Sequence, residues 1–114
     1  MFRVVALCAV SILPPTTASA QASPGSATWV MPGCRTYVNG TGWNENEFRA
    51  GVCTGTVRGV LYMDAGGTCA PEAVTQDQMV RVVAHYIDAR PSRQHENFVK
   101  LATEALRAAW PCRR

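Results

Sequence analysis

The spacing of apolar residues predicts an all-α protein with about four helices. The clearest amphipathic pattern follows Thr75, which can form a capping box with Gln78 at the start of a helix. This helix is expected to stop at Arg90, because Pro91 disfavours helical geometry in the residue before it. Its apolar stripe recurs at helical spacing and consists of Met79, Val80, Val83, Tyr86 and Ile87.

A second strong stripe predicts the last helix, with Ser92 as its N-cap and Pro111 at its end. The stripe runs for over three turns and consists of Phe98, Leu101, Ala102, Ala105, Leu106, Ala109 and Trp110. The short connection at Arg90 to Ser92 makes these two helices antiparallel neighbours. We therefore expect the core to lie between them, around Val83, Tyr86, Leu101 and Leu106.

The pattern before residue 64 is weaker and predicts two helices. The first runs from about Pro32 to Asn39, where Gly40 can end it. The second starts at a capping box of Asn44 and Glu47 and ends near Met63. A helical wheel puts its apolar arc at Phe48, Val52, Cys53, Thr56, Val60 and Met63.

Three glycines, Gly51, Gly55 and Gly59, recur every four residues beside this arc. They predict either a ridge without side chains, where another backbone comes close, or simply a weak helix. No run alternates with period two for long enough to predict a strand, so the fold class is all-α.

The N-terminus is typical of an export signal and defines the expected organisation of the chain. Arg3 precedes an apolar stretch from Val4 to Leu13, and Ala18-Ser19-Ala20 is a cleavage pattern. Ten apolar residues are too few for a helix to cross a membrane, so we expect no membrane insertion. Residues 1–20 are then the signal peptide, 21–30 a flexible mature N-terminus, and 31–114 a compact single helical domain of an exported protein.

Length and charge narrow the class further. The chain has 114 residues, of which 11 are Lys or Arg and 8 are Asp or Glu, giving a net charge of +3. This length allows one domain, and so mild a charge does not fit a nucleic-acid-binding protein.

Four cysteines follow the leader, which itself contains Cys8. An even number in a small exported chain predicts two disulfides, for which three pairings exist. Antiparallel neighbouring helices select the pairs Cys34–Cys53 and Cys69–Cys112. Since there is no C-x-x-C or H-x-x-x-H spacing, we expect neither a metal nor another cofactor.

Few residues are suited to catalysis, so the protein is not expected to be an enzyme. His85 falls on the polar side of its helix, and His95 is expected in the first turn of the last helix. Glu96, Lys100 and Glu104 have the spacing of charges on a helix surface. A small hydrolase would require one of the thiols to be free.

The combined motifs resemble the Rap1a/Tai immunity-protein family over about residues 33 to 112. They are Gly33-Cys34, Gly51-Val52-Cys53-x-Gly55-x-Val57-x-Gly59, Cys69-x-Pro71, Gln78-Met79-Val80-Arg81-Val82-Val83-x-x-Tyr86-Ile87, Pro91-x-x-x-His95 and Ala105-Leu106-x-x-x-Trp110-Pro111-Cys112. The resemblance implies a small all-α periplasmic protein that binds and inhibits a peptidoglycan amidase delivered by the type VI secretion system. It also implies that the protein can act as a homodimer.

Inhibition would then proceed by occlusion, with a loop and a helix face covering the cleft of the enzyme. The short polar loop Asp64–Thr68 differs among family members and is the expected contact, through Asp64, Gly66 and Gly67. Arginines and aromatic residues often supply the binding energy of an interface. Arg58 and Arg81 are therefore also candidate contact residues, and Trp29, Trp43 and Tyr62 are further candidates. The alternative is a periplasmic helical module without a toxin partner, such as a chaperone or envelope-assembly factor.

Overall fold

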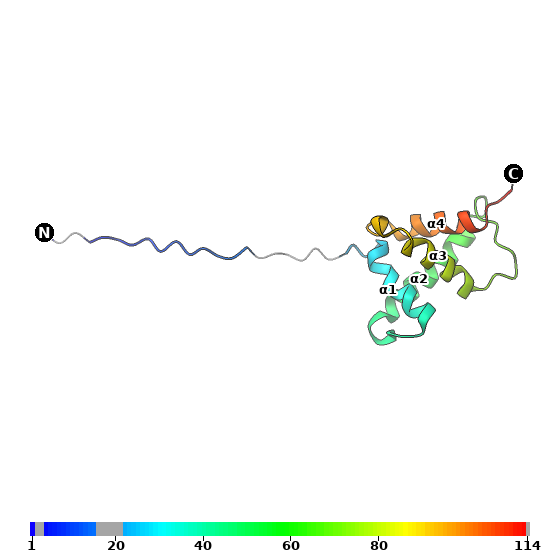
Figure 1. Cartoon of the computed structure of the whole chain (residues 1–114), viewed down its shortest axis with the longest axis horizontal. Helices are drawn as coiled ribbons and strands as arrows, with labels where there is room; N and C mark the ends of the chain where they lie inside the picture. Colours follow the sequence, from blue (N-terminus) through cyan, green and yellow to red (C-terminus); the bar gives the residue numbers. More distant parts are fainter. Residues whose placement is uncertain (2–3, 16–21, 114) are drawn as a thin grey trace.

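The computed structural model describes residues 1, 4–15 and 22–113, and these contain four α-helices (Figure 1). The elements are α1 (Ala27–Asn39), α2 (Trp43–Met63), α3 (Gln76–Asp88), the 3₁₀ turn η1 (Pro91–Arg93) and α4 (Phe98–Ala109). Within the described residues there is no strand, only the isolated bridges Ser26–Asn97 and Thr68–Pro111. The all-α prediction is therefore confirmed.

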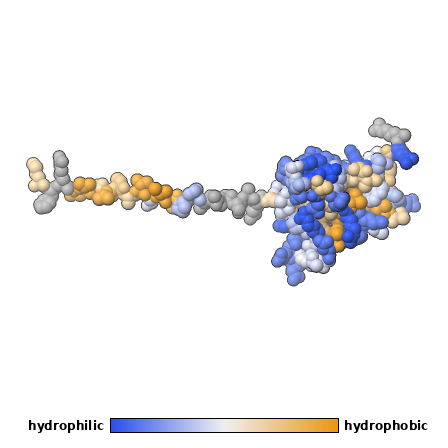
Figure 2. Space-filling model, in the orientation of Figure 1, coloured by the Kyte–Doolittle hydropathy of each residue, from blue (hydrophilic) through white to orange (hydrophobic). Residues whose placement is uncertain are grey.

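The chain as a whole is not compact, unlike the single domain that the sequence predicted. Its radius of gyration is 23.2 Å and its extents are 95 × 34 × 22 Å, whereas a folded chain of this size measures about 13–14 Å. The difference comes from the N-terminal segment, which runs away from the packed helices (Figure 1). Residues 4–15 are exposed and mostly hydrophobic, while the helical part carries a largely hydrophilic surface with hydrophobic patches (Figure 2). The expected cleavage pattern at residues 18–20 lies outside the described residues.

Helix α1 begins at Ala27, five residues before the predicted start, so the expected flexible segment 21–30 is wrong from Ser26 onward. The Ser26 side chain accepts a hydrogen bond from the Trp29 amide, and Ala27 is fully buried. The backbone here is also held from across the fold: the Ala27 amide donates to the Glu96 carbonyl at 2.9 Å. Contacts with a segment about 70 residues away therefore order this end of α1.

Helices α1 and α2 approach each other closely at Gly33. A Cβ atom on Gly33 would lie 2.1 Å from the Arg49 carbonyl carbon and 2.3 Å from the Ala50 amide nitrogen. Only glycine fits there. The next residue, Cys34, forms a disulfide with Cys53 of α2, with a Cα–Cα distance of 5.4 Å, and both cysteines are fully buried.

The buried face of α2 differs from the predicted arc. It consists of Ala50, Cys53, Val57 and Val60, and its centre lies roughly 90° around the helix from the predicted one at 100° per residue. Phe48 and Met63 are instead exposed, at 75% and 88%. Helix α2 has apolar or small residues of its own on several sides, so its sequence alone does not determine which side packs against the core.

The start of α2 also differs from the prediction. The helix begins at Trp43 after Gly42, which has a φ of 77° and forms no side-chain cap. Asn44 and Glu47 therefore do not form the expected capping box. The left-handed conformation of Gly42 turns the chain between α1 and α2, and this geometry favours glycine.

Helix α3 and its packing against α4 follow the sequence closely. Thr75 and Gln78 form the predicted capping box, with the Thr75 amide donating to Gln78 Oε1 at 2.9 Å. Val83, Leu101 and Leu106 are at most 1% exposed, so they form the expected core, whereas Tyr86 is only half-buried.

The sequence predicted Ser92 as the N-cap of α4, and this prediction is wrong. Residues Pro91–Arg93 form a 3₁₀ turn, and Asn97 is the cap: its Oδ1 accepts hydrogen bonds from the Val99 and Lys100 amides. His95 consequently lies before the helix rather than in its first turn. The apolar stripe placed α4 correctly, but it carries no information about which of two polar residues caps the helix.

Candidate functional site

The loop Asp64–Thr68 follows α2 and is attached to α4 through an ion pair. The Asp64 carboxylate accepts hydrogen bonds from Arg107 Nε and from Thr68 Oγ1, both at 2.8 Å. Arg107 and Thr68 lower the pKa of Asp64 to about 2. Asp64 is therefore a charged anchor of the loop, with most of its carboxylate covered by its two partners.

The other end of the loop is joined to the C-terminal segment. Thr68 pairs with Pro111 in an isolated bridge, and the Cys69 amide donates to the Trp110 carbonyl at 2.8 Å. The Cys69–Cys112 disulfide closes this contact, with a Cα–Cα distance of 4.9 Å. Both predicted disulfide pairings are thus confirmed, and the loop is braced at both ends.

The two loop glycines have different surroundings. A Cβ atom on Gly67 would lie 2.5 Å from Arg107 Nε and 2.8 Å from Asp64 Oδ2, so Gly67 lies directly against the ion pair. Gly66 is exposed, and a Cβ atom there would meet nothing within 4 Å. Beside them is a shallow hollow of about 380 Å³, which is lined by Asp64, Gly66, Gly67, Arg107, Pro111 and Cys112.

The two candidate arginines lie away from this loop and brace the start of α3. Arg58 of α2 donates from Nη1 to Gln76 Oε1 at 3.2 Å. Arg81 pairs with Asp77 at 2.7 Å and also donates to the Val38 carbonyl of α1. The ion-pair partner of the loop is instead Arg107, to which no sequence motif pointed. Its position five residues before Cys112 was a usable clue, because the predicted Cys69–Cys112 disulfide brings that end of α4 to the loop.

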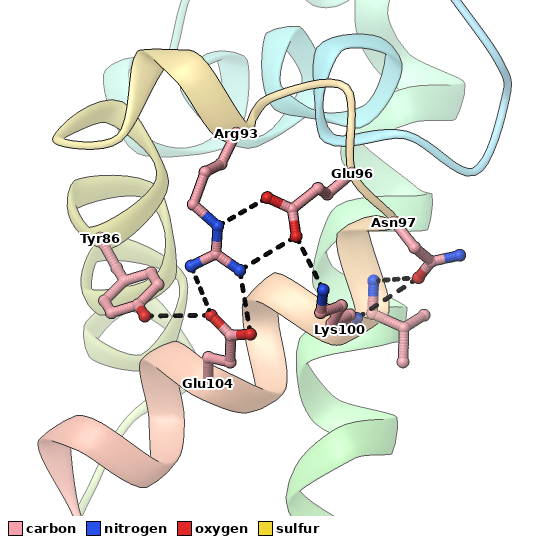
Figure 3. A network of polar contacts seen from close by, with 7 residues as sticks. Tyr86, Arg93, Glu96, Asn97, Lys100 and Glu104 are labelled. Carbon is pink, nitrogen blue, oxygen red and sulfur yellow. Dashed lines mark hydrogen bonds and ion pairs between the residues drawn. The ribbon is translucent and has the colours of Figure 1, made fainter.

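A second polar cluster joins η1, α4 and α3 (Figure 3). The Arg93 guanidinium contacts Glu96 at 2.6 Å and Glu104 at 2.8 Å, and Lys100 pairs with Glu96. The hydroxyl of Tyr86 donates to Glu104 at 3.1 Å.

The cations of this cluster stabilise the ionised form of its two carboxylates. Arg93 and Lys100 lower the pKa of Glu96 to about 2, and Arg93 also lowers the pKa of Glu104. Glu96, Lys100 and Glu104 were expected to be charges at i, i+4 spacing on the surface of the last helix. The structure brings them together around Arg93, where every polar group is paired, and they fasten the connection before α4.

The described residues offer few groups suited to catalysis or metal binding. His85 and His95 are both exposed. In the part of the chain that the structure describes, no three His, Cys, Asp or Glu side chains are grouped to hold a metal ion. The free thiol in this part belongs to Cys8, in the N-terminal segment. No helix among the described residues is both long enough and apolar enough to cross a membrane.

The aromatic candidates are distributed over α1 and α2. Trp29 is half-buried, with its ring 6.1 Å from that of Phe48 and with the Arg49 guanidinium 5.0 Å from its centroid. Trp43 and Tyr62 are 43% and 72% exposed. Tyr62 and Phe48 thus offer large apolar surface, whereas Trp29 is partly used in packing α1 against α2.

A small helical scaffold fastened by disulfides, with a braced polar loop and exposed aromatics, is typical of a protein that acts by binding another protein. The sequence model of the protein family described as Rap1a immunity proteins matches residues 5–112, nearly the whole chain. The chain therefore belongs to this family. Membership implies a role in immunity to an effector of the type VI secretion system. No curated protein and no solved structure matches the chain.

Proposed function

We propose that this protein is a periplasmic immunity protein that binds a type VI secreted peptidoglycan amidase and blocks its active site. Family membership over residues 5–112 supports the immunity role. The apolar segment 4–13 supports export, with cleavage after Ala20. Two disulfides fit an oxidising compartment such as the periplasm.

The observation that carries the mechanism is the braced loop Asp64–Thr68. A mobile loop loses conformational entropy when it binds, and this loss weakens the complex. Here the ion pair of Asp64 with Arg107 and the Cys69–Cys112 disulfide order the loop before any partner arrives. Inhibition then consists of filling a cleft with a preformed loop, without any chemical step on the immunity protein.

The contact that we propose is centred on Asp64, Gly66 and Gly67. Gly66 forms the accessible part of the loop, and the absence of a side chain lets its backbone approach an enzyme surface closely. Arg58 and Arg81, which are exposed cations on α2 and α3, would extend the contact beyond the loop. Each already has a hydrogen-bond partner within the chain, so its side chain is positioned before binding.

The test uses Gly66→Phe in pull-down and peptidoglycan hydrolysis assays with amidases encoded beside the gene. Gly66 is exposed and a Cβ atom there would meet nothing within 4 Å, so the fold should survive and the melting temperature should change little. The phenylalanine side chain would obstruct the approach of the loop to a cleft. We expect inhibition to fall at least tenfold, while the wild type inhibits at a fixed stoichiometry and leaves the enzyme chemically unmodified.

His85→Phe is the matched control, because it places the same side chain at an exposed position of α3. It should inhibit like the wild type. Binding that leaves hydrolysis intact would refute occlusion. If no such amidase binds, the alternative of a helical module without a toxin partner is favoured. Full inhibition by Gly66→Phe would refute the assignment to this loop.

A further inference from the structure

The two disulfides of this protein have different surroundings. Cys34 and Cys53 are both fully buried where α1 packs against α2. Cys69 is instead exposed, and Cys112 is half-buried. Thiol–disulfide exchange requires a thiolate to reach one of the two sulfur atoms. The Cys69–Cys112 bond can therefore be attacked in the folded protein, whereas attack on Cys34–Cys53 requires α1 and α2 to separate.

A hollow beside the exposed bond gives a reductant room to approach. It has a volume of about 380 Å³, and both Cys112 and Arg107 are in its lining. This is the size of pockets that hold small organic molecules. The negative charge of Asp64 is balanced by Arg107, and Arg113 adds a positive charge directly after Cys112. These surroundings favour a thiolate, both as the attacking and as the leaving group.

The C-terminal segment 111–113 is held mainly by this bond. None of its residues is buried. Its hydrogen bond to the loop runs from the Cys112 amide to the Gly67 carbonyl and is long, at 3.4 Å. The preceding residue, Trp110, packs against the core. Without the disulfide, the segment is therefore free to leave the loop by turning about Trp110.

We propose that the Cys69–Cys112 disulfide is a redox switch, which a dithiol reductant opens in the folded protein while the buried disulfide stays closed. One thiolate of the reductant attacks the sulfur of Cys69 and forms a mixed disulfide, and Cys112 leaves as a thiolate. The second thiol of the reductant then attacks the reductant's own sulfur in the mixed disulfide and releases Cys69. Two electrons and two protons thus pass from the dithiol to the two cysteines, and the reductant becomes a disulfide.

Opening the bond changes the loop and leaves the helices in place. Leu101 and Leu106 of α4 are at most 1% exposed, and the buried disulfide still joins α1 to α2. The loop keeps the ion pair of Asp64 with Arg107 at its start but loses its covalent attachment at the other end. A loop that is free at one end loses more conformational entropy when it binds. The reduced protein should therefore bind an effector more weakly, an expectation that rests on the proposed function.

Reduction of the folded wild type is the first test, and it needs no effector. The oxidised protein is treated with dithiothreitol without denaturant, its thiols are alkylated, and each cysteine is followed by peptide mass spectrometry. We expect Cys69 and Cys112 to react at least tenfold faster than Cys34 and Cys53. In guanidinium chloride, where the protein is unfolded, the two pairs should react together. Equal rates in the folded protein, or earlier opening of Cys34–Cys53, would overturn the proposal.

NMR spectra of the selectively reduced protein separate a local opening from general unfolding. Amide signals of residues 64–69 and 110–113 should move toward the positions of a flexible chain. Signals around Cys34 and Cys53 are the control and should keep their positions, with an unchanged helical circular dichroism signal. Unmoved loop signals would contradict the switch. Loss of the helical signal would show that the bond holds the whole fold, which also refutes the proposal.

The double variant Cys69→Ser with Cys112→Ser gives the open state without any reductant, so an effect of dithiothreitol on the effector is avoided. It should fold and melt about 10–20 °C below the oxidised wild type, because the closure of a 43-residue separation is lost. It should need at least tenfold more protein for half-inhibition of the effector. Wild type that is reduced and then reoxidised is the control and should recover full inhibition. A double variant that does not fold would overturn the proposal.

Failure of the switch and failure of the proposed function give different results. If the proposed function is wrong, the oxidised wild type itself does not inhibit, and the alkylation and NMR measurements still decide the proposal. If the switch is wrong, the oxidised wild type and the double variant inhibit equally.

Discussion

The close contact at Gly33 predicts that replacing this glycine with alanine destabilises the protein, whereas the same replacement in an ordinary helix is stabilising. In Gly33→Ala the new Cβ atom would lie 2.1 Å from the Arg49 carbonyl carbon. Ordinary contact begins near 3.4 Å, so α1 and α2 would have to separate locally by about 1.3 Å. The obstacle is backbone on the facing helix, so no side-chain rotation can relieve it. The neighbouring Cys34–Cys53 disulfide further limits the separation.

The free energies can be compared directly. Alanine gains roughly 1 kcal/mol over glycine in a helix. Overpacking by one methyl group costs about 1–3 kcal/mol, and here the upper end applies because backbone must move. The net loss for Gly33→Ala is then about 2 kcal/mol. For a domain of this size that corresponds to a melting temperature lower by roughly 8–16 °C.

Gly51→Ala on α2 is the matched control, because a Cβ atom there meets nothing within 4 Å. In thermal melts of the oxidised protein at a few micromolar, it should raise the melting temperature by a few degrees. The two alanine variants should therefore move in opposite directions. If Gly33→Ala melts at or above the wild-type temperature, the close approach of α1 and α2 is wrong.

Three other measurements test the core, a cap and the loop. Leu106→Ala removes a fully buried side chain and should cost about 2–5 kcal/mol in denaturant melts; a loss under about 0.5 kcal/mol would contradict its burial. Asn97→Ala should cost about 1 kcal/mol by removing the cap of α4. Ser92→Ala should change stability by much less, and equal effects would refute this assignment. The pKa of Asp64 is lowered to about 2, so its stabilisation is present above its ordinary pKa of 3.8 and is lost as the pH falls toward 2. The stability difference from Asp64→Asn should therefore shrink on acidification, and a constant difference would contradict the ion pair.

Local sequence determined the parts of this fold that depend on residues within a single helix. The Thr75 and Gln78 capping box acts within a single turn, so it can be identified without knowledge of the fold. The apolar stripe around Leu101 and Leu106 is strong enough to fix the packed side of α4. Once the helices were placed as antiparallel neighbours, the chain allowed only one convenient pairing of its cysteines, and both bonds are present.

For the candidate site, the sequence located the polar loop after α2 but not its partner. Asp64 and Arg107 are 43 residues apart, and only the folding of α4 back along α2 brings the guanidinium to the carboxylate. Arg58 and Arg81 were chosen for their residue type alone, and in the fold their side chains pair with Gln76 and Asp77 in the first turn of α3.

Tertiary structure alone decided the features that depend on contacts between distant segments. The start of α1 combines a local cap at Ser26 with a hydrogen bond from the Ala27 amide to the Glu96 carbonyl, about 70 residues away, and only the second of these depends on the fold. Helix α2 has small or apolar residues on several sides, and its buried side follows from where α1 and Cys34 lie. At the predicted ridge, a Cβ atom on Gly51, Gly55 or Gly59 would meet nothing within 4 Å in the described part of the chain, whereas one on Gly33 would clash with the backbone of α2. A glycine removes a steric obstacle but provides no attraction, so the sequence marks where a backbone can come close, and only the fold decides which glycine is used.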